Sequence, residues 1–110
     1  DLDQSTGLNR VHLRSTTNKV LLAANAEGND LAAKVYIINK ATDTTLYLTV
    51  TINAQTIGKL YAGDWMFIPW SQTDTDASIE VAATNWTSST GDVPVEYALF
   101  HEDTDFLTNA

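Results

Sequence analysis

Residues 45–53 constrain the fold more than any other part of the chain. Aliphatic residues occupy every second position and alternate with Tyr, Thr and Asn, so an extended strand would have one apolar and one polar side. A helix would distribute the same aliphatic residues around its circumference. These residues are Leu46, Leu48, Val50 and Ile52. The pattern therefore predicts a half-buried β-strand.

Seven further segments read as strands, and no stretch shows a sustained helical period. Residues 34–39 carry apolar groups on both sides, which is typical of a strand covered on both faces. The short polar connection at 40–44 predicts an antiparallel hairpin between this strand and the one at 45–53. The other predicted strands are 11–16, 19–24, 56–61, 65–70, 78–84 and 95–101. About eight strands predict an all-β, single-domain antiparallel β-sandwich, jelly-roll-like in form.

Length and charge narrow the class of protein. A chain of 110 residues fits one domain, with an expected core at 11–103, an N-terminal arm without strand pattern at 1–10 and a tail at 104–110. The absence of Cys excludes disulfides, thiolate metal sites and thiol catalysis. A formal charge of −8 argues against a surface that binds nucleic acid or an anionic membrane, and no apolar run is long enough to span one.

The sequence shows no convergent catalytic or metal-binding motif. There are two histidines: His12 lies on the polar parity of its strand, and His101 ends the last strand beside two acidic residues. Neither a His-x-His pair nor an HExxH helix is present, and no Gly-x-Ser-x-Gly elbow supplies a nucleophile. We therefore expect no enzyme, no cofactor and no metal.

Two acidic patterns have a functional and an ordinary interpretation. Glu80 and Glu96 lie on the polar parity of their strands and could face each other like the paired carboxylates of a glycosidase. Asp74 and Asp76 resemble half of a calcium loop, but the remaining ligands and the Gly of such a loop are absent. Carboxylates on outward strand faces and in loops ordinarily serve solubility, and we favour that interpretation for both.

The segment 60–70 is harder to explain as part of an isolated sandwich. A turn with Gly63 at a position that favours positive φ leads into a strand that is apolar on both sides, and Pro69 places this strand at a sheet edge or ends it there. Either other parts of the chain cover the second side or another subunit does. One side has Trp65, Phe67 and Pro69, and the other has Met66, Ile68 and Trp70.

Four segments of the chain resemble small virion structural proteins of tailed bacteriophages. They have a strand that ends in an Asn-Lys step, an alternating strand, an Ala-Gly-Asp-Trp turn into an aromatic strand, and a terminal strand that contains Glu-Tyr. The segments are residues 35–40, 46–50, 60–70 and 95–102. Within that group, the size, acidity and lack of Cys are most similar to those of the capsid decoration, or cement, proteins.

The resemblance implies a homotrimer on the outer capsid surface of the virion. Its partners would be its own copies and the major capsid protein, and it would clamp neighbouring capsid subunits without catalysis. Residues in the aromatic segment would lie in the core and the subunit interface, and residues 1–10 would form an arm on the capsid. The interface residues that follow are Tyr61, Trp65, Phe67, Trp70, Leu2, Leu8 and Arg10.

Two other functions are compatible with the sequence. A tail, baseplate or fibre component of a virion would have the same fold at another position in the particle. A carbohydrate-binding β-sandwich would stack a sugar ring on Trp65, Trp70 or Trp86, of which Trp86 lies in a polar loop.

Overall fold

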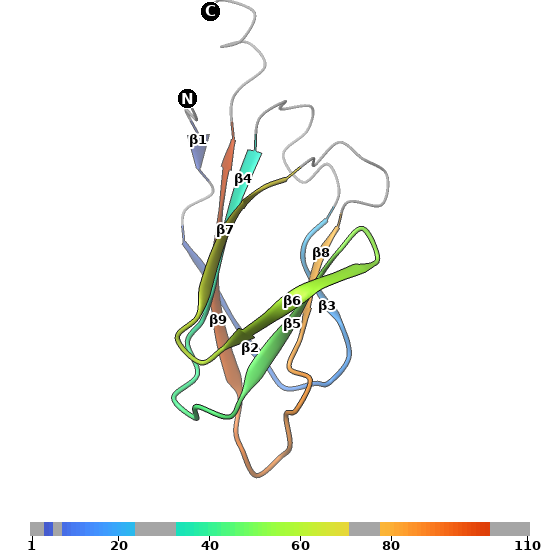
Figure 1. Ribbon diagram of the computed structural model, residues 1–110. Helices are drawn as coiled ribbons and strands as arrows, with labels where there is room; N and C mark the ends of the chain where they lie inside the picture. Colours follow the sequence, from blue (N-terminus) through green and yellow to red (C-terminus); the bar gives the residue numbers. More distant parts are fainter. Residues whose placement is uncertain (1–3, 6–7, 24–32, 71–77, 102–110) are drawn as a thin grey trace, which may run out of the picture.

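The computed structural model describes residues 4–5, 8–23, 33–70 and 78–101 of the chain. These residues form nine strands and no helix (Figure 1). The eight strands expected from the sequence are all present, as β2 to β9, and the all-β sandwich is confirmed. The strands are β1 (Gln4–Ser5), β2 (Asn9–Leu13), β3 (Lys19–Leu22), β4 (Ala33–Asn39), β5 (Tyr47–Ile52), β6 (Gln55–Tyr61), β7 (Trp65–Pro69), β8 (Ile79–Ala82) and β9 (Val93–His101).

The strands form two antiparallel sheets that face each other. The first sheet has the order β2-β9-β4-β7, and the short β1 also pairs with β9. The second sheet has the order β3-β8-β5-β6. In Figure 1 the first sheet lies to the left and the second to the right. β5 and β6 are the only consecutive strands from β2 onward that share a sheet, so almost every connection crosses the sandwich.

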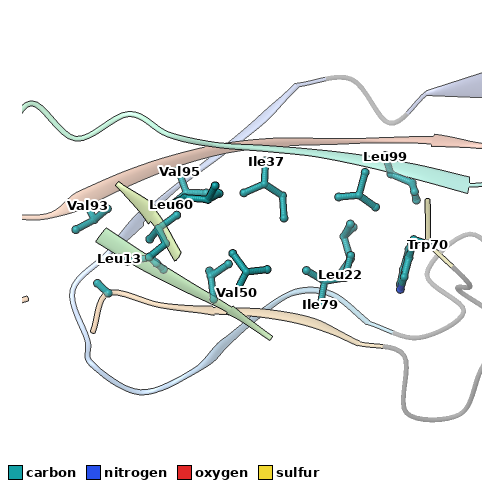
Figure 2. Close-up of a cluster of buried hydrophobic side chains, with 14 of the residues drawn as sticks. Leu13, Leu22, Ile37, Val50, Leu60, Trp70, Ile79, Val93, Val95 and Leu99 are labelled. Carbon is teal, nitrogen blue, oxygen red and sulfur yellow. The ribbon is translucent and has the colours of Figure 1, made fainter. Parts of the chain in front are cut away.

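The core consists of the inward side chains of both sheets. On β4 the buried side chains alternate with more exposed ones, so Val35 and Ile37 are fully buried. The same two-residue period buries Leu48 and Val50 on β5. Figure 2 shows these two layers meeting, with Ile37 and Leu99 of the first sheet directed toward side chains of the second. The apolar parity found in the sequence is therefore the parity that faces the core.

The predicted hairpin between residues 34–39 and 45–53 is wrong. β4 pairs with β7 and β9 in the first sheet, whereas β5 pairs with β6 and β8 in the second. The polar connection between them is short enough for a hairpin, but it turns across the sandwich. The reason lies at Asn39, the last residue of β4, directly before this connection.

Asn39 is a polar side chain in a core position, with no exposed surface. Its Nδ2 donates to the main-chain carbonyl of Leu60 at 2.9 Å and to that of Leu46 at 3.4 Å. Its Oδ1 accepts from the main-chain N–H of Ala41 at 2.9 Å. One buried amide thus satisfies main-chain groups at the start of the β4–β5 connection, at its end and on β6.

The backbone of Asn39 also holds the turn between β6 and β7. Its N–H donates to the carbonyl of Asp64 at 3.0 Å, and its carbonyl accepts from the N–H of Gly63 at 2.8 Å. Gly63 has a φ of 86°, which confirms the positive φ expected there. Residues that have a Cβ adopt such an angle only at a cost in free energy. The carboxylate of Asp64 accepts from the N–H of Tyr61 at 3.0 Å and closes the turn.

The expected N-terminal arm is partly built into the first sheet. β1 pairs Gln4 with His101 and Ser5 with Phe100, and β2 begins at Asn9 rather than at residue 11. Main-chain pairing to β9 holds Asn9 and Arg10 in the sheet. Because main-chain hydrogen bonds do not depend on the type of side chain, the sequence shows no apolar alternation at these residues. Leu2 lies outside the described residues.

We predict that Asn39→Ala destabilises the fold by about 2–4 kcal/mol, since it leaves buried main-chain groups on Leu46, Leu60 and Ala41 without their partner. Chemical denaturation measures the change in the free energy of unfolding. Asn18→Ala, at an exposed position, is the matched control and is expected to stay within about 0.5 kcal/mol of the wild type. Equal effects of the two substitutions would contradict the role of Asn39.

Candidate functional site: the outer face of the first sheet

β7 has one side in the core and one side in solvent. Met66 and Ile68 are half-buried and pack against the core, whereas Trp65 is 63% exposed and Phe67 is 47% exposed. β7 is the last strand of the first sheet and ends at Pro69, as the proline predicted. Within the described residues, nothing covers these two rings from outside. The second apolar side of the strand is therefore a surface.

The neighbouring strand β4 extends this surface. The register places Tyr36 opposite Phe67 and Ile38 opposite Trp65, and residues that face each other across an antiparallel pair lie on the same side of the sheet. The rings of Tyr36 and Trp65 are tilted at 42° with centroids 6.2 Å apart. Tyr36 and Ile38 are half-buried. They lie beside the rings of β7 and are less exposed than those rings.

β9 completes the patch on the far side of β4. Phe100 makes an edge-to-face contact with Phe67, with ring centroids 5.9 Å apart. It is half-buried, and Ala98, which lies opposite Tyr36, is 3% exposed because larger neighbours cover its single methyl group. We define the aromatic face as the large apolar side chains on the outward side of β4, β7 and β9: Tyr36, Ile38, Trp65, Phe67 and Phe100.

Charged and apolar groups of β2 border the aromatic face. Arg10 lies opposite Glu96 in the register, and its Nη1 is 3.5 Å from the Glu96 carboxylate. Leu8, directly before β2, is 63% exposed. Arg10 therefore lies on the same side of the first sheet as Trp65 and Phe67. The sequence had assigned these residues to two separate regions, an arm and a strand.

Trp70 does not belong to the surface. It is 5% exposed and packs in the core at one end of the sandwich (Figure 2), and its main-chain N–H donates to the carbonyl of Ala33 at 3.0 Å. The alternation of β7 continues one residue beyond the strand and turns Trp70 inward. The assignment of Trp70 to a subunit interface is therefore corrected to a core position.

Tyr61 lies on the other side of the molecule. It pairs with Tyr47 in the second sheet, with ring centroids 5.1 Å apart, and the Nζ of Lys59 lies 4.6 Å from the centre of the Tyr47 ring. Tyr61 is 45% exposed, close to the value for Phe67. It is an exposed aromatic group outside the aromatic face. The turn after Tyr61 leads the chain across the sandwich, which separates it from Trp65.

The acidic candidates do not form a catalytic pair. Glu80 is an outward residue of the second sheet and Glu96 an outward residue of the first, so the thickness of the sandwich separates them. Asp74 and Asp76 lie outside the described residues. In the described ranges, no three His, Asp or Glu side chains are grouped so that they could hold a metal ion, and no helix could cross a membrane.

The remaining candidates lack an open, convergent surface. Trp86 is half-buried and packs against the core, and its indole N–H is buried without a partner among the described residues. His12 lines a depression of about 450 Å³ that a single stretch, residues 12–19, surrounds. Arg14 in that stretch donates to the Asp92 carboxylate at 2.8 Å and is already paired.

The comparisons with known proteins add no family. No protein-family model matches the chain, and none of the curated proteins matches its sequence. The described residues thus define a β-sandwich whose first sheet carries the exposed aromatic face.

We predict that the two tryptophans differ in their contribution to stability. Trp70→Ala is expected to lower the free energy of unfolding by about 3–5 kcal/mol, because it opens a cavity in the core. Trp65→Ala is expected to cost less than about 1 kcal/mol, because its indole is largely in solvent. Urea denaturation of both variants measures the difference, and comparable losses would contradict the placement of the two rings.

Proposed function

We propose that the chain is a non-enzymatic capsid decoration protein of a bacteriophage. It binds the outer surface of the head as an oligomer and bridges neighbouring subunits of the major capsid protein. The observation that carries the proposal is the aromatic face, on which Trp65 and Phe67 are 63% and 47% exposed. A contiguous apolar patch on a small sandwich marks a surface that another protein covers.

The size of the aromatic face suits a contact that works in several copies. Trp65 and Phe67 together expose roughly 250 Å², and covering this area stabilises a contact by on the order of 6 kcal/mol as an upper bound. Association itself costs about 4–15 kcal/mol in lost freedom, so one such patch binds weakly. In an oligomer, the second and later contacts are intramolecular and the total binding is much tighter.

The charge of the chain is compatible with this role. A net charge of −8 keeps unassembled copies soluble and favours encounter with basic patches on a capsid. Exposed charges act over about 8–10 Å at physiological salt, so binding that they assist weakens as salt is added.

Two features of the fold support the resemblance to virion proteins. The strand orders β2-β9-β4-β7 and β3-β8-β5-β6, with connections that cross between the sheets, support an eight-stranded jelly roll as the arrangement of the sandwich, and the jelly roll is a fold of viral capsid and lectin domains. The two motifs of the resemblance, the Asn39-Lys40 step and the turn at Gly63, are in direct contact through main-chain hydrogen bonds. The motifs therefore belong to one structural unit.

We predict that a double variant, Trp65→Ala with Phe67→Ala, loses most of its binding to heads of the phage that encodes the chain. The substitutions remove the exposed apolar area and leave the core unchanged. Co-sedimentation of purified protein with heads that lack it measures the loss, with an expected drop in apparent affinity of at least tenfold. Raising the salt concentration is expected to weaken wild-type binding further.

The matched control replaces the aromatic pair on the opposite side of the sandwich, Tyr47→Ala with Tyr61→Ala. This variant is expected to bind heads as the wild type does. If the wild-type protein does not bind heads, or if both double variants bind equally well, the proposal is wrong. Cryo-electron microscopy of the particle would then show whether the chain occupies the tail, the baseplate or a fibre.

A carbohydrate-binding module is the second candidate, and the exposed indole of Trp65 favours it. Sugar rings stack on exposed aromatic side chains, whereas Trp70 is buried and Trp86 is half-buried against the core. Titration of the intrinsic Trp fluorescence across a glycan panel tests this function. A saturable change that Trp65→Phe abolishes would support it, and no response to any glycan would eliminate it.

A further inference from the structure

The backbone of β7 has a free side, and its direction follows from the hydrogen bonds to β4. The bonds from Trp70 N–H to Ala33 and from Asn39 N–H to Asp64 bracket β7 at its two ends, each at 3.0 Å. Each of these bonds lies one position beyond Trp65 or Pro69 in the register. The pairs that Trp65 and Pro69 form with β4 are therefore of the non-hydrogen-bonded type. Because the two pair types alternate, the N–H and C=O groups of residues 65, 67 and 69 point away from β4.

No other described strand pairs with β7 on that side. Its outward donors are the N–H groups of Trp65 and Phe67, since Pro69 has none. Its outward acceptors are the carbonyls of all three residues. The same three residues direct their side chains to the outer side of the sheet, so the open main-chain edge and the aromatic face meet along one line.

β7 has less protection against pairing than the other sheet edges. Edge strands usually carry a charged side chain, a proline or a bulge that prevents pairing with another chain, and of these β7 has only Pro69, at its end. β2, β3 and β6 carry Arg10, Lys19 and Lys59, and the pairings of β3 and β6 contain a register shift. β7 reads Trp-Met-Phe-Ile-Pro, has no charge and pairs with β4 without a shift.

We propose that β7 is the contact between two copies of this chain, which pair their β7 strands antiparallel about Phe67. In this register, the two Phe67 residues exchange both of their main-chain hydrogen bonds. The N–H of each Trp65 donates to the carbonyl of Pro69 in the second copy. The missing N–H of Pro69 falls at the end of the paired segment, where the opposing carbonyl remains open to water.

The side chains match in the same register. Phe67 lies beside Phe67 of the second copy, with Tyr36 next to each on its own β4, so one aromatic row runs across the seam. Trp65 lies beside Pro69 of the second copy, an apolar pair. A self-complementary strand of this kind fits a two-fold axis, the commonest symmetry of soluble oligomers.

The charge of the chain is compatible with a second copy at this edge. Two chains with a net charge of −8 repel each other, so a contact between copies forms where neither side presents a carboxylate. β7 supplies such a strand. Trp65 and Phe67 expose roughly 250 Å², against about 800 Å² per partner in a stable interface, so the main-chain bonds are needed and the dimer depends on concentration.

This contact goes beyond capsid binding, although it involves the same two residues, Trp65 and Phe67. It pairs copies around a two-fold axis, whereas the resemblance to decoration proteins implies three copies around a three-fold axis. The mass of the free protein in solution therefore separates the two arrangements.

Sedimentation equilibrium over a range of concentrations measures this mass. The wild-type chain is expected to approach twice its mass of 12.0 kDa as its concentration rises. Phe67→Lys and Trp65→Lys each place a charge on the edge and are expected to weaken dimerisation at least tenfold. Tyr61→Lys changes the net charge equally, at a position of similar exposure on the other sheet, and is expected to dimerise as the wild type does.

Amide hydrogen exchange tests the pairing itself. In a single copy no described residue bonds to the N–H groups of Trp65 and Phe67, whereas those of Met66 and Ile68 are bonded to β4. Dimerisation is expected to slow exchange at 65 and 67 at least tenfold and to leave 66 and 68 nearly unchanged. A monomer at all concentrations, a trimer, or a dimer in which the amides of 65 and 67 still exchange rapidly would each overturn the inference. If the chain binds to heads as a monomer, the pairing of β7 strands is wrong and the proposed binding to the capsid is retained.

Discussion

The buried amide of Asn39 is the interaction on which the arrangement of the sheets depends. Asn39 is the last residue of β4 and has no exposed surface. Its side chain bonds to main-chain groups of the β4–β5 connection and of β6, and its backbone bonds to the turn between β6 and β7. A buried amide is costly unless its donors and acceptor are all used, and here they are. Its geometry therefore favours one path for the chain, in which β5 leaves the first sheet and β7 returns to it.

That path also accounts for the exposed aromatic face. Because the turn at Gly63 leads β7 to the edge of the first sheet, one side of the strand packs on the core and no described residue lies over the other. Met66 and Ile68 on the inner side contribute to the sandwich, while Trp65 and Phe67 contribute little to the stability of a single copy. Large exposed rings carry a risk of aggregation, and a chain retains them most readily where a partner covers them.

Much of the fold was predictable from the sequence, because strand character is a local property. All eight predicted strands exist, and the edge position of β7 follows from Pro69. The pairing of strands was less predictable: the short link after Lys40 looks like a hairpin, and only the buried position of Asn39 shows why it is not. A polar residue on the apolar parity of Val35 and Ile37 was the available signal. For the site, Trp65 and Phe67 were found from their alternation, whereas Tyr36 and Phe100 required the register of β4 with β7 and β9.

The sequence by itself determined where the chain is extended and that residues 65–70 are apolar on both sides, because the two-residue period of a strand can be read from neighbouring residues. Only the tertiary structure decided which side faces the core. It buried Trp70, left Trp65 in solvent, and placed Tyr61 on the opposite side of the molecule although only three residues separate it from Trp65 in the chain. The physical reason is that the membership of a strand in a sheet depends on the direction of its connections. Buried hydrogen bonds between residues distant in sequence fix that direction here.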